Sequence, residues 1–152
     1  LMEIIRNNYK IFILVILALN IIGVILVLSS PFGGMTVATY YGPRDRFASL
    51  GSEYSEALDN LFIVLIAVCL SVTALFSFIL NRALQDHSRK TINLATTISI
   101  ITVVLAITGG VLFNIIRAET NYLDWWLDTG FYTSLIVGLI NTFFYAVALR
   151  KT

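Results

Sequence analysis

Charge is scarce in this 152-residue chain, and that scarcity excludes most classes of protein. Only 12% of the residues are Asp, Glu, Lys or Arg, and 58% are hydrophobic, whereas a soluble domain carries about 25% charged residues. So few charges cannot cover a soluble globule of this size, and disorder requires low hydrophobicity. A formal net charge of +1 without a basic stripe argues against nucleic-acid binding. The composition therefore predicts an integral membrane protein.

Residues that build cofactor and metal sites are almost absent. The chain has one histidine, His87, and one cysteine, Cys69, so it cannot form a bis-histidine haem site, an internal disulfide or a thiolate metal cluster. We find no glycine-rich phosphate loop, serine nucleophile elbow or metalloprotease helix. We therefore predict no catalytic residue, no cofactor and no metal site, and interpret Cys69 as a small packing residue.

Long stretches without any charged residue enclose four apolar segments. Each segment is close to the roughly 20 residues with which a helix crosses about 30 Å of hydrocarbon. The segments cover residues 11–28, 61–80, 92–116 and 131–149. The first is longer than the apolar part of a signal peptide and lacks a small-residue cleavage site, so we interpret it as a span. We predict an all-α integral membrane protein, with residues 1–152 forming one antiparallel bundle of four transmembrane helices.

These apolar segments contain no ionisable acid or base. Proton relays, voltage sensors and most ion-coupled transporters need such groups inside the membrane. We therefore do not expect those mechanisms.

The basic residues predict how the bundle is oriented. With the N-terminus in the cytoplasm, seven of the ten Lys and Arg residues lie inside: Arg6, Lys10, Arg82, Arg89, Lys90, Arg150 and Lys151. Only Arg44, Arg46 and Arg117 then lie outside. Because cytoplasmic loops are rich in Lys and Arg, we expect both termini to be cytoplasmic. Frequent isoleucine favours a prokaryotic plasma membrane.

This orientation defines one inner loop, residues 81–90, and two outer loops, residues 29–60 and 117–130. The first outer loop is much longer than the usual 2–8 residues of a bundle connection. Its first half is rich in turn residues, and residues 52–58 suit a helix that leads into the second span. In the second outer loop, Asn121 and Asp124 have the spacing of a capped short helix lying in the membrane interface.

Aromatic residues follow in the second outer loop. Tyr122, Trp125 and Trp126 fit the belt of interfacial anchors at the head-group level. Alternatively, the tryptophan pair docks a partner protein.

Two spans carry small residues at four-residue spacing, which places them on one helix face. The third span has Thr102, Ala106 and Gly110, and the fourth has Ser134, Gly138, Thr142 and Ala146. Such faces let helices approach closely in lipid. Packing within the chain is the simpler interpretation, and packing against another subunit is the alternative.

Asn20 and Asn141 lie near the middle of the first and fourth spans. Because these spans run in opposite directions, the two amides should reach a similar depth and form a hydrogen bond between helices. A contact with a ligand is the alternative.

The outline is similar to that of the tetraspan claudins and of small four-helix subunits of quinone-linked oxidoreductases. The paired cysteines and the Trp-Gly-Leu-Trp motif of the claudins are absent, and no motif of the second group is present, so no family is assigned.

The leading functional hypothesis is a non-catalytic accessory subunit of a larger membrane complex. If that complex is an enzyme, this chain supplies none of its catalytic residues. Its partners would be other membrane subunits, in a hetero-oligomer rather than a homo-oligomer, together with lipids. One alternative is a self-assembling tetraspan or pore, lined by the polar stripe Asn93, Thr96, Thr97, Ser99 and Thr102. Another is a small lipid- or quinone-binding membrane protein.

Overall fold

The computed structural model describes residues 3–4, 8–82 and 89–149. Its four long helices are α2 (Tyr9–Ser29), α3 (Ala57–Arg82), α4 (Arg89–Ala118) and α5 (Thr129–Leu149). Each is long and apolar enough to cross a membrane, and each contains one predicted span. A mostly helical chain with four candidate transmembrane helices is thus confirmed. Part of the predicted inner loop, with Asp86 and His87, lies outside the described residues, as do Arg6, Arg150 and Lys151.

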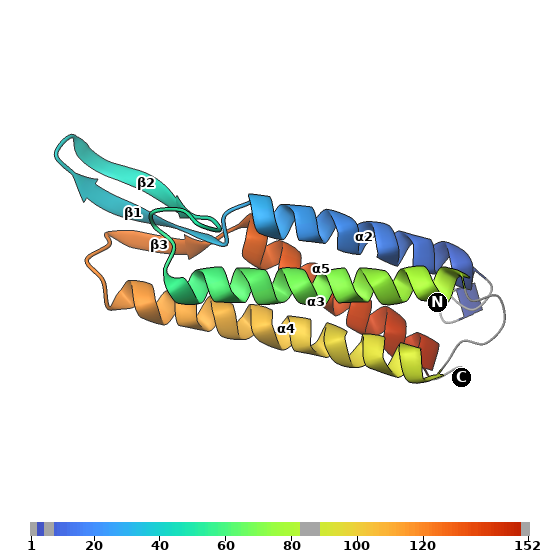
Figure 1. Ribbon diagram of the computed structural model, residues 1–152. Helices are drawn as coiled ribbons and strands as arrows, with labels where there is room; N and C mark the ends of the chain where they lie inside the picture. Colours follow the sequence, from blue (N-terminus) through green and yellow to red (C-terminus); the bar gives the residue numbers. More distant parts are fainter. Residues whose placement is uncertain (1–2, 5–7, 83–88, 150–152) are drawn as a thin grey trace.

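The helices form a ring in which successive helices run in opposite directions (Figure 1). α2 and α4 each pack against both α3 and α5. The helices are apolar on their outer faces as well as their inner faces: Ile22, Val104 and Phe143 are all more than half exposed. Apolar residues all around a helix are expected where lipid, and not water, surrounds the bundle.

A small antiparallel sheet lies at the end of the bundle where α2 ends and α5 begins (Figure 1). Strands β1 (Gly33–Thr39) and β2 (Gly42–Ala48) form a hairpin within the first predicted outer loop. Strand β3 (Asp124–Leu127), from the second, pairs with the other edge of β1. We call this end of the molecule the sheet end.

The sheet corrects three predictions for the loops. The chain is not all-α, because residues of the supposed turn-rich half form β1 and β2. The predicted helix over residues 52–58 begins only at Ala57. The predicted interfacial helix in the second loop is wrong: its segment is β3, and the carboxylate of Asp124 accepts the N–H of Trp125 at 2.8 Å.

The pairing of β3 with β1 explains the last correction. The N–H of Leu123 donates to the carbonyl of Thr36 at 2.9 Å, and the N–H of Asp128 to that of Phe32 at 3.0 Å. These two hydrogen bonds flank β3. They give the backbone N–H groups at its two ends partners on β1 or just before it, whereas in a short helix the partners would lie within the same segment. Tertiary pairing therefore determines the conformation of this loop.

Candidate functional site

The inner face of the sheet packs closely on the bundle. Met35 of β1 is fully buried, and its neighbours across the sheet are Arg46 and Trp125. Gly33 lies against the ring of Phe113 in α4, so close that an added Cβ would come within 2.4 Å of a ring atom. The hairpin is therefore attached to the end of α4 through a contact that only glycine allows.

The outer face of the sheet carries an aromatic pair. The ring of Trp126 lies within 2.5 Å of the position a Cβ on Gly34 would take. It also meets the ring of Phe47 edge to face, with centroids 6.2 Å apart. Phe47 remains about half exposed, so this pair forms an accessible aromatic surface.

The hairpin projects away from the bundle and ends in two tyrosines (Figure 1). Tyr40 and Tyr41 are 96% and 84% exposed, and their rings meet at right angles with centroids 5.3 Å apart. Gly42 follows with a φ of +104°, a conformation that L side chains rarely adopt. We call Tyr40 and Tyr41 the hairpin tip.

A buried ion pair lies beneath the sheet, between the ends of α3 and α4. The guanidinium of Arg117 donates from Nη2 to Asp59 Oδ2 at 2.5 Å and to the carbonyl of Tyr54 at 3.1 Å. It also lies over the ring of Phe113, 4.4 Å from the centroid. The Arg117 side chain is fully buried and that of Asp59 nearly so.

Asp59 and Arg117 lie just outside the predicted spans, residues 61–80 and 92–116, but they belong to the longer helices α3 and α4. In the sequence, these two charges only mark the ends of the spans. The available signal was the presence of opposite charges at the same end of two successive spans. It is a weak signal, since charges in such positions are usually solvated.

The amides of Asn20 and Asn141 are buried and meet across α2 and α5, as expected. Asn20 Nδ2 donates to Asn141 Oδ1 at 3.0 Å, and Asn141 Nδ2 donates to Asn20 Oδ1 at 2.8 Å. A second polar contact joins the buried hydroxyls of Ser77 and Tyr145. Both contacts satisfy buried polar groups inside the bundle. The amides of Asn20 and Asn141 are hydrogen-bonded to each other.

We expect Asn141→Leu to lower the free energy of unfolding by about 1 kcal/mol, because interhelical hydrogen bonds in membranes average about 0.6 kcal/mol and the remaining amide loses its partner. The double variant Asn20→Leu/Asn141→Leu should lose less than the sum of the two single variants. Unfolding in detergent, followed by circular dichroism, measures these differences. Strictly additive losses would contradict an energetic coupling between the amides.

The small-residue faces pack between α4 and α5 of the same chain. Gly138 lies against Val103 and Thr102, and Gly110 lies against the ring of Phe131. The remaining members differ in burial: Ala106 and Ser134 are buried, whereas Thr142 and Ala146 are partly exposed. Around Gly110 and Gly138, residues of the same chain therefore cover the helix surfaces that could have met another subunit.

The three predicted interfacial anchors do not share one surface. Trp125 and Tyr122 pack against the inner core of the sheet end, and the Tyr122 ring lies 6.0 Å from the Arg117 guanidinium carbon. Trp126 lies on the outer face. Anchoring in a membrane interface therefore stays a prediction, and it applies best to Trp126.

In the part of the chain that the structure describes, no group of three His, Cys, Asp or Glu residues is arranged to hold a metal ion. Comparison with known proteins finds no matching protein family, no matching curated protein and no matching solved structure.

Proposed function

We propose that this chain is a non-catalytic accessory subunit of a larger membrane complex and that it binds its partner through the hairpin tip. The supporting observation is the exposure of Tyr40 and Tyr41 at the end of a rigidly attached hairpin. Tyrosine is enriched at the energetic centres of interfaces, since it buries a large surface and loses little conformational entropy.

The edge of β2 is less suited to binding than the tip. Pro43 lacks an N–H group, and Arg44, Asp45 and Arg46 place charges along the same strand. Proline and charges on an edge strand oppose the addition of another strand. A partner is therefore expected to contact side chains at the tip, and not to extend the sheet.

The polar groups of the bundle also favour an accessory role over a pore. Thr96, Ser99 and Thr102 are buried and donate to carbonyls of their own helix. Asn93 and Thr97, the other members of the proposed polar stripe, are exposed. The stripe is thus divided between two surfaces, whereas a pore needs a continuous polar lining.

The test is purification of the full chain from its native membrane in a mild detergent, followed by mass spectrometry. We expect stoichiometric larger subunits to accompany the wild-type chain. Tyr40→Ser/Tyr41→Ser should reduce their recovery at least about tenfold, since hot-spot truncations cost about 2 kcal/mol or more. The matched control Tyr40→Phe/Tyr41→Phe keeps both rings and should retain most of the binding.

Two results would contradict this proposal. One is a chain that purifies alone or as a ring of identical copies. The other is a stoichiometric partner whose recovery is the same with the serine variant as with the phenylalanine control.

A further inference from the structure

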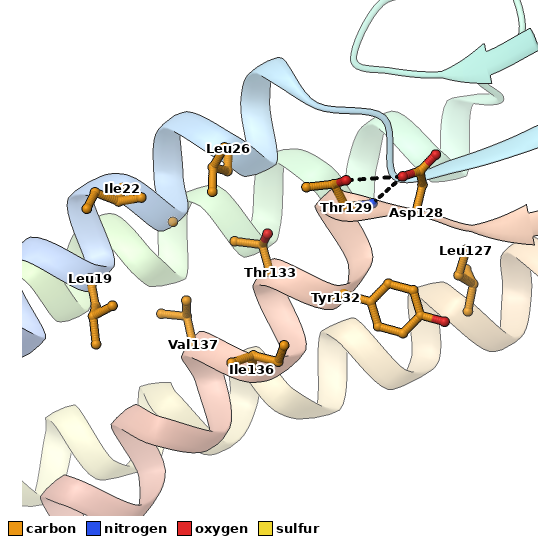
Figure 2. Close-up of a pocket in the computed structure, with 11 residues that line it drawn as sticks. Leu19, Ile22, Leu26, Leu127, Asp128, Thr129, Tyr132, Thr133, Ile136 and Val137 are labelled. Atoms are coloured by element: carbon orange, nitrogen blue, oxygen red, sulfur yellow. Dashed lines mark hydrogen bonds between the residues drawn. The ribbon is translucent and has the colours of Figure 1, made fainter.

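A groove runs between α2 and α5 from the middle of the bundle to the sheet end. Its volume is about 430 Å³, within the range of about 300–1,000 Å³ that is usual for ligand sites. Figure 2 shows Leu19, Ile22 and Leu26 on α2, opposite Ile136 and Val137 on α5. Both helices are candidate membrane spans, so the groove would open toward the hydrocarbon of a bilayer.

The contacts between α2 and α5 keep this groove in place. At its inner end the helices are joined by the Asn20–Asn141 amide pair, and a Cβ added to Gly23 would lie 3.5 Å from Val137. At its outer end, the N–H of Gly130 donates to the carbonyl of Pro31 at 2.9 Å. The helices are thus fixed to each other on both sides of the groove, which makes the groove a preformed feature of the fold.

The sheet end of the groove is polar and carries a carboxylate. Asp128, Thr129 and Tyr132 lie there (Figure 2), directly where the α5 span begins. Asp128 Oδ1 accepts the N–H and the hydroxyl of Thr129 at 2.7 and 3.1 Å. Oδ2 accepts only the indole N–H of Trp126, at a long 3.3 Å, among the contacts described.

This arrangement selects the chemistry of the occupant. An ionised carboxylate only accepts hydrogen bonds, so Oδ2 can receive a further donor. Among the described residues that line the groove, none is Lys or Arg, so no cation there would balance the net negative charge of an anionic lipid. The complementary head group is a primary ammonium, which supplies both positive charge and N–H donors.

We propose that this groove binds one acyl chain of a phosphatidylethanolamine-type lipid and that Asp128 holds its ammonium group. The apolar walls take the hydrocarbon chain. The carboxylate lies at the end of the span, at the level where a lipid head group begins. This site is separate from the hairpin tip and does not depend on the accessory role.

The experiment uses the full chain reconstituted in bilayers that contain equal amounts of phosphatidylethanolamine, phosphatidylcholine and phosphatidylglycerol. Lipids that remain bound after transfer to detergent are counted by native mass spectrometry. We expect one retained phosphatidylethanolamine, about tenfold enriched over each of the others. Phosphatidylcholine is the critical comparison, because its quaternary ammonium has the charge but no N–H donor.

Three variants separate the head-group contact from the groove. Asp128→Asn keeps a side-chain oxygen that can accept the N–H of Thr129. It should abolish the preference for phosphatidylethanolamine while one lipid is still retained. Thr133→Phe fills the groove and should reduce retention of every lipid at least about tenfold, whereas the near-isosteric Thr133→Val should not. Circular dichroism confirms that each variant is folded.

Three results would overturn the proposal. The first is equal retention of the three lipids, or enrichment of the anionic one, by the wild-type chain. The second is undiminished retention by folded Thr133→Phe. The third is a wild-type dimer that Thr133→Phe dissociates, which would assign the groove to a second copy of this chain.

Discussion

Arg117→Met is expected to lower the free energy of unfolding by about 3–5 kcal/mol, because it leaves the carboxylate of Asp59 buried without its partner. The variant also removes the hydrogen bond to the carbonyl of Tyr54 and the contact with the ring of Phe113. Detergent unfolding followed by tryptophan fluorescence is a suitable measurement, since Trp125 and Trp126 lie in the sheet above the ion pair.

A double variant tests whether the unpaired charge of Asp59 causes this loss of stability. Asp59→Asn/Arg117→Met removes both charges and still offers an oxygen to the N–H of Glu56, which Asp59 accepts at 2.8 Å. Nε and Nη1 of Arg117 have no hydrogen-bond partner among the described residues. The pair is therefore incompletely satisfied, and its neutral replacement should recover more than half of the loss.

Arg46→Met provides the matched control. Arg46 also lies over an aromatic ring, that of Tyr54 at 5.7 Å, but it is partly exposed in the sheet. We expect it to cost about 1 kcal/mol or less. An Arg117→Met variant as stable as Arg46→Met would contradict a large stabilising contribution from the buried ion pair.

The helices could be predicted from sequence because a span is a local property. About 20 apolar residues without charge are sufficient to indicate one, and the four predicted segments lie within α2, α3, α4 and α5. The contact between Asn20 and Asn141 followed from the same reasoning, since antiparallel spans bring their centres to one depth.

The sheet could not be obtained in this way, because its pairing joins distant parts of the chain. Residues 35–39 include the β-branched Thr36, Val37 and Thr39, which favour a strand. The four residues of β3, however, form a strand only because β1 offers them a free edge. Asp124 lies within this strand, so its spacing from Asn121 does not mark a helix cap.

Burial of Arg117 was missed for a related reason. Its partner Asp59 lies 58 residues away along the chain, and hydropathy treats any charge as the end of a span. The charge is tolerated because an ion pair, a backbone carbonyl and two aromatic rings surround it. Only the tertiary structure assembles these groups.

Gly33→Ala is expected to cost about 1–3 kcal/mol, because its Cβ would lie 2.4 Å from the ring of Phe113 and overpack the base of the hairpin. Unfolding in detergent measures the loss. Exposure of Trp125 and Trp126, seen as a red shift of the fluorescence, would report detachment of the sheet. In the control Gly23→Ala, the added Cβ would lie 3.4 Å or more from its neighbours, so we expect little change.

Phe113 determines how this variant should couple to others. Its ring lies against Gly33 and also beneath the guanidinium of Arg117. A smaller side chain in Phe113→Leu should accommodate the new methyl group, so Gly33→Ala/Phe113→Leu should be more stable than the sum of the single losses predicts, by about 0.5–3 kcal/mol. Additive losses would mean that the ring does not oppose the methyl group. A displaced ring would also disturb Arg117. The double variant Gly33→Ala/Arg117→Met should therefore lose less free energy of unfolding than the sum of the two single losses. Such a result would show that the attachment of the sheet and the ion pair are energetically coupled.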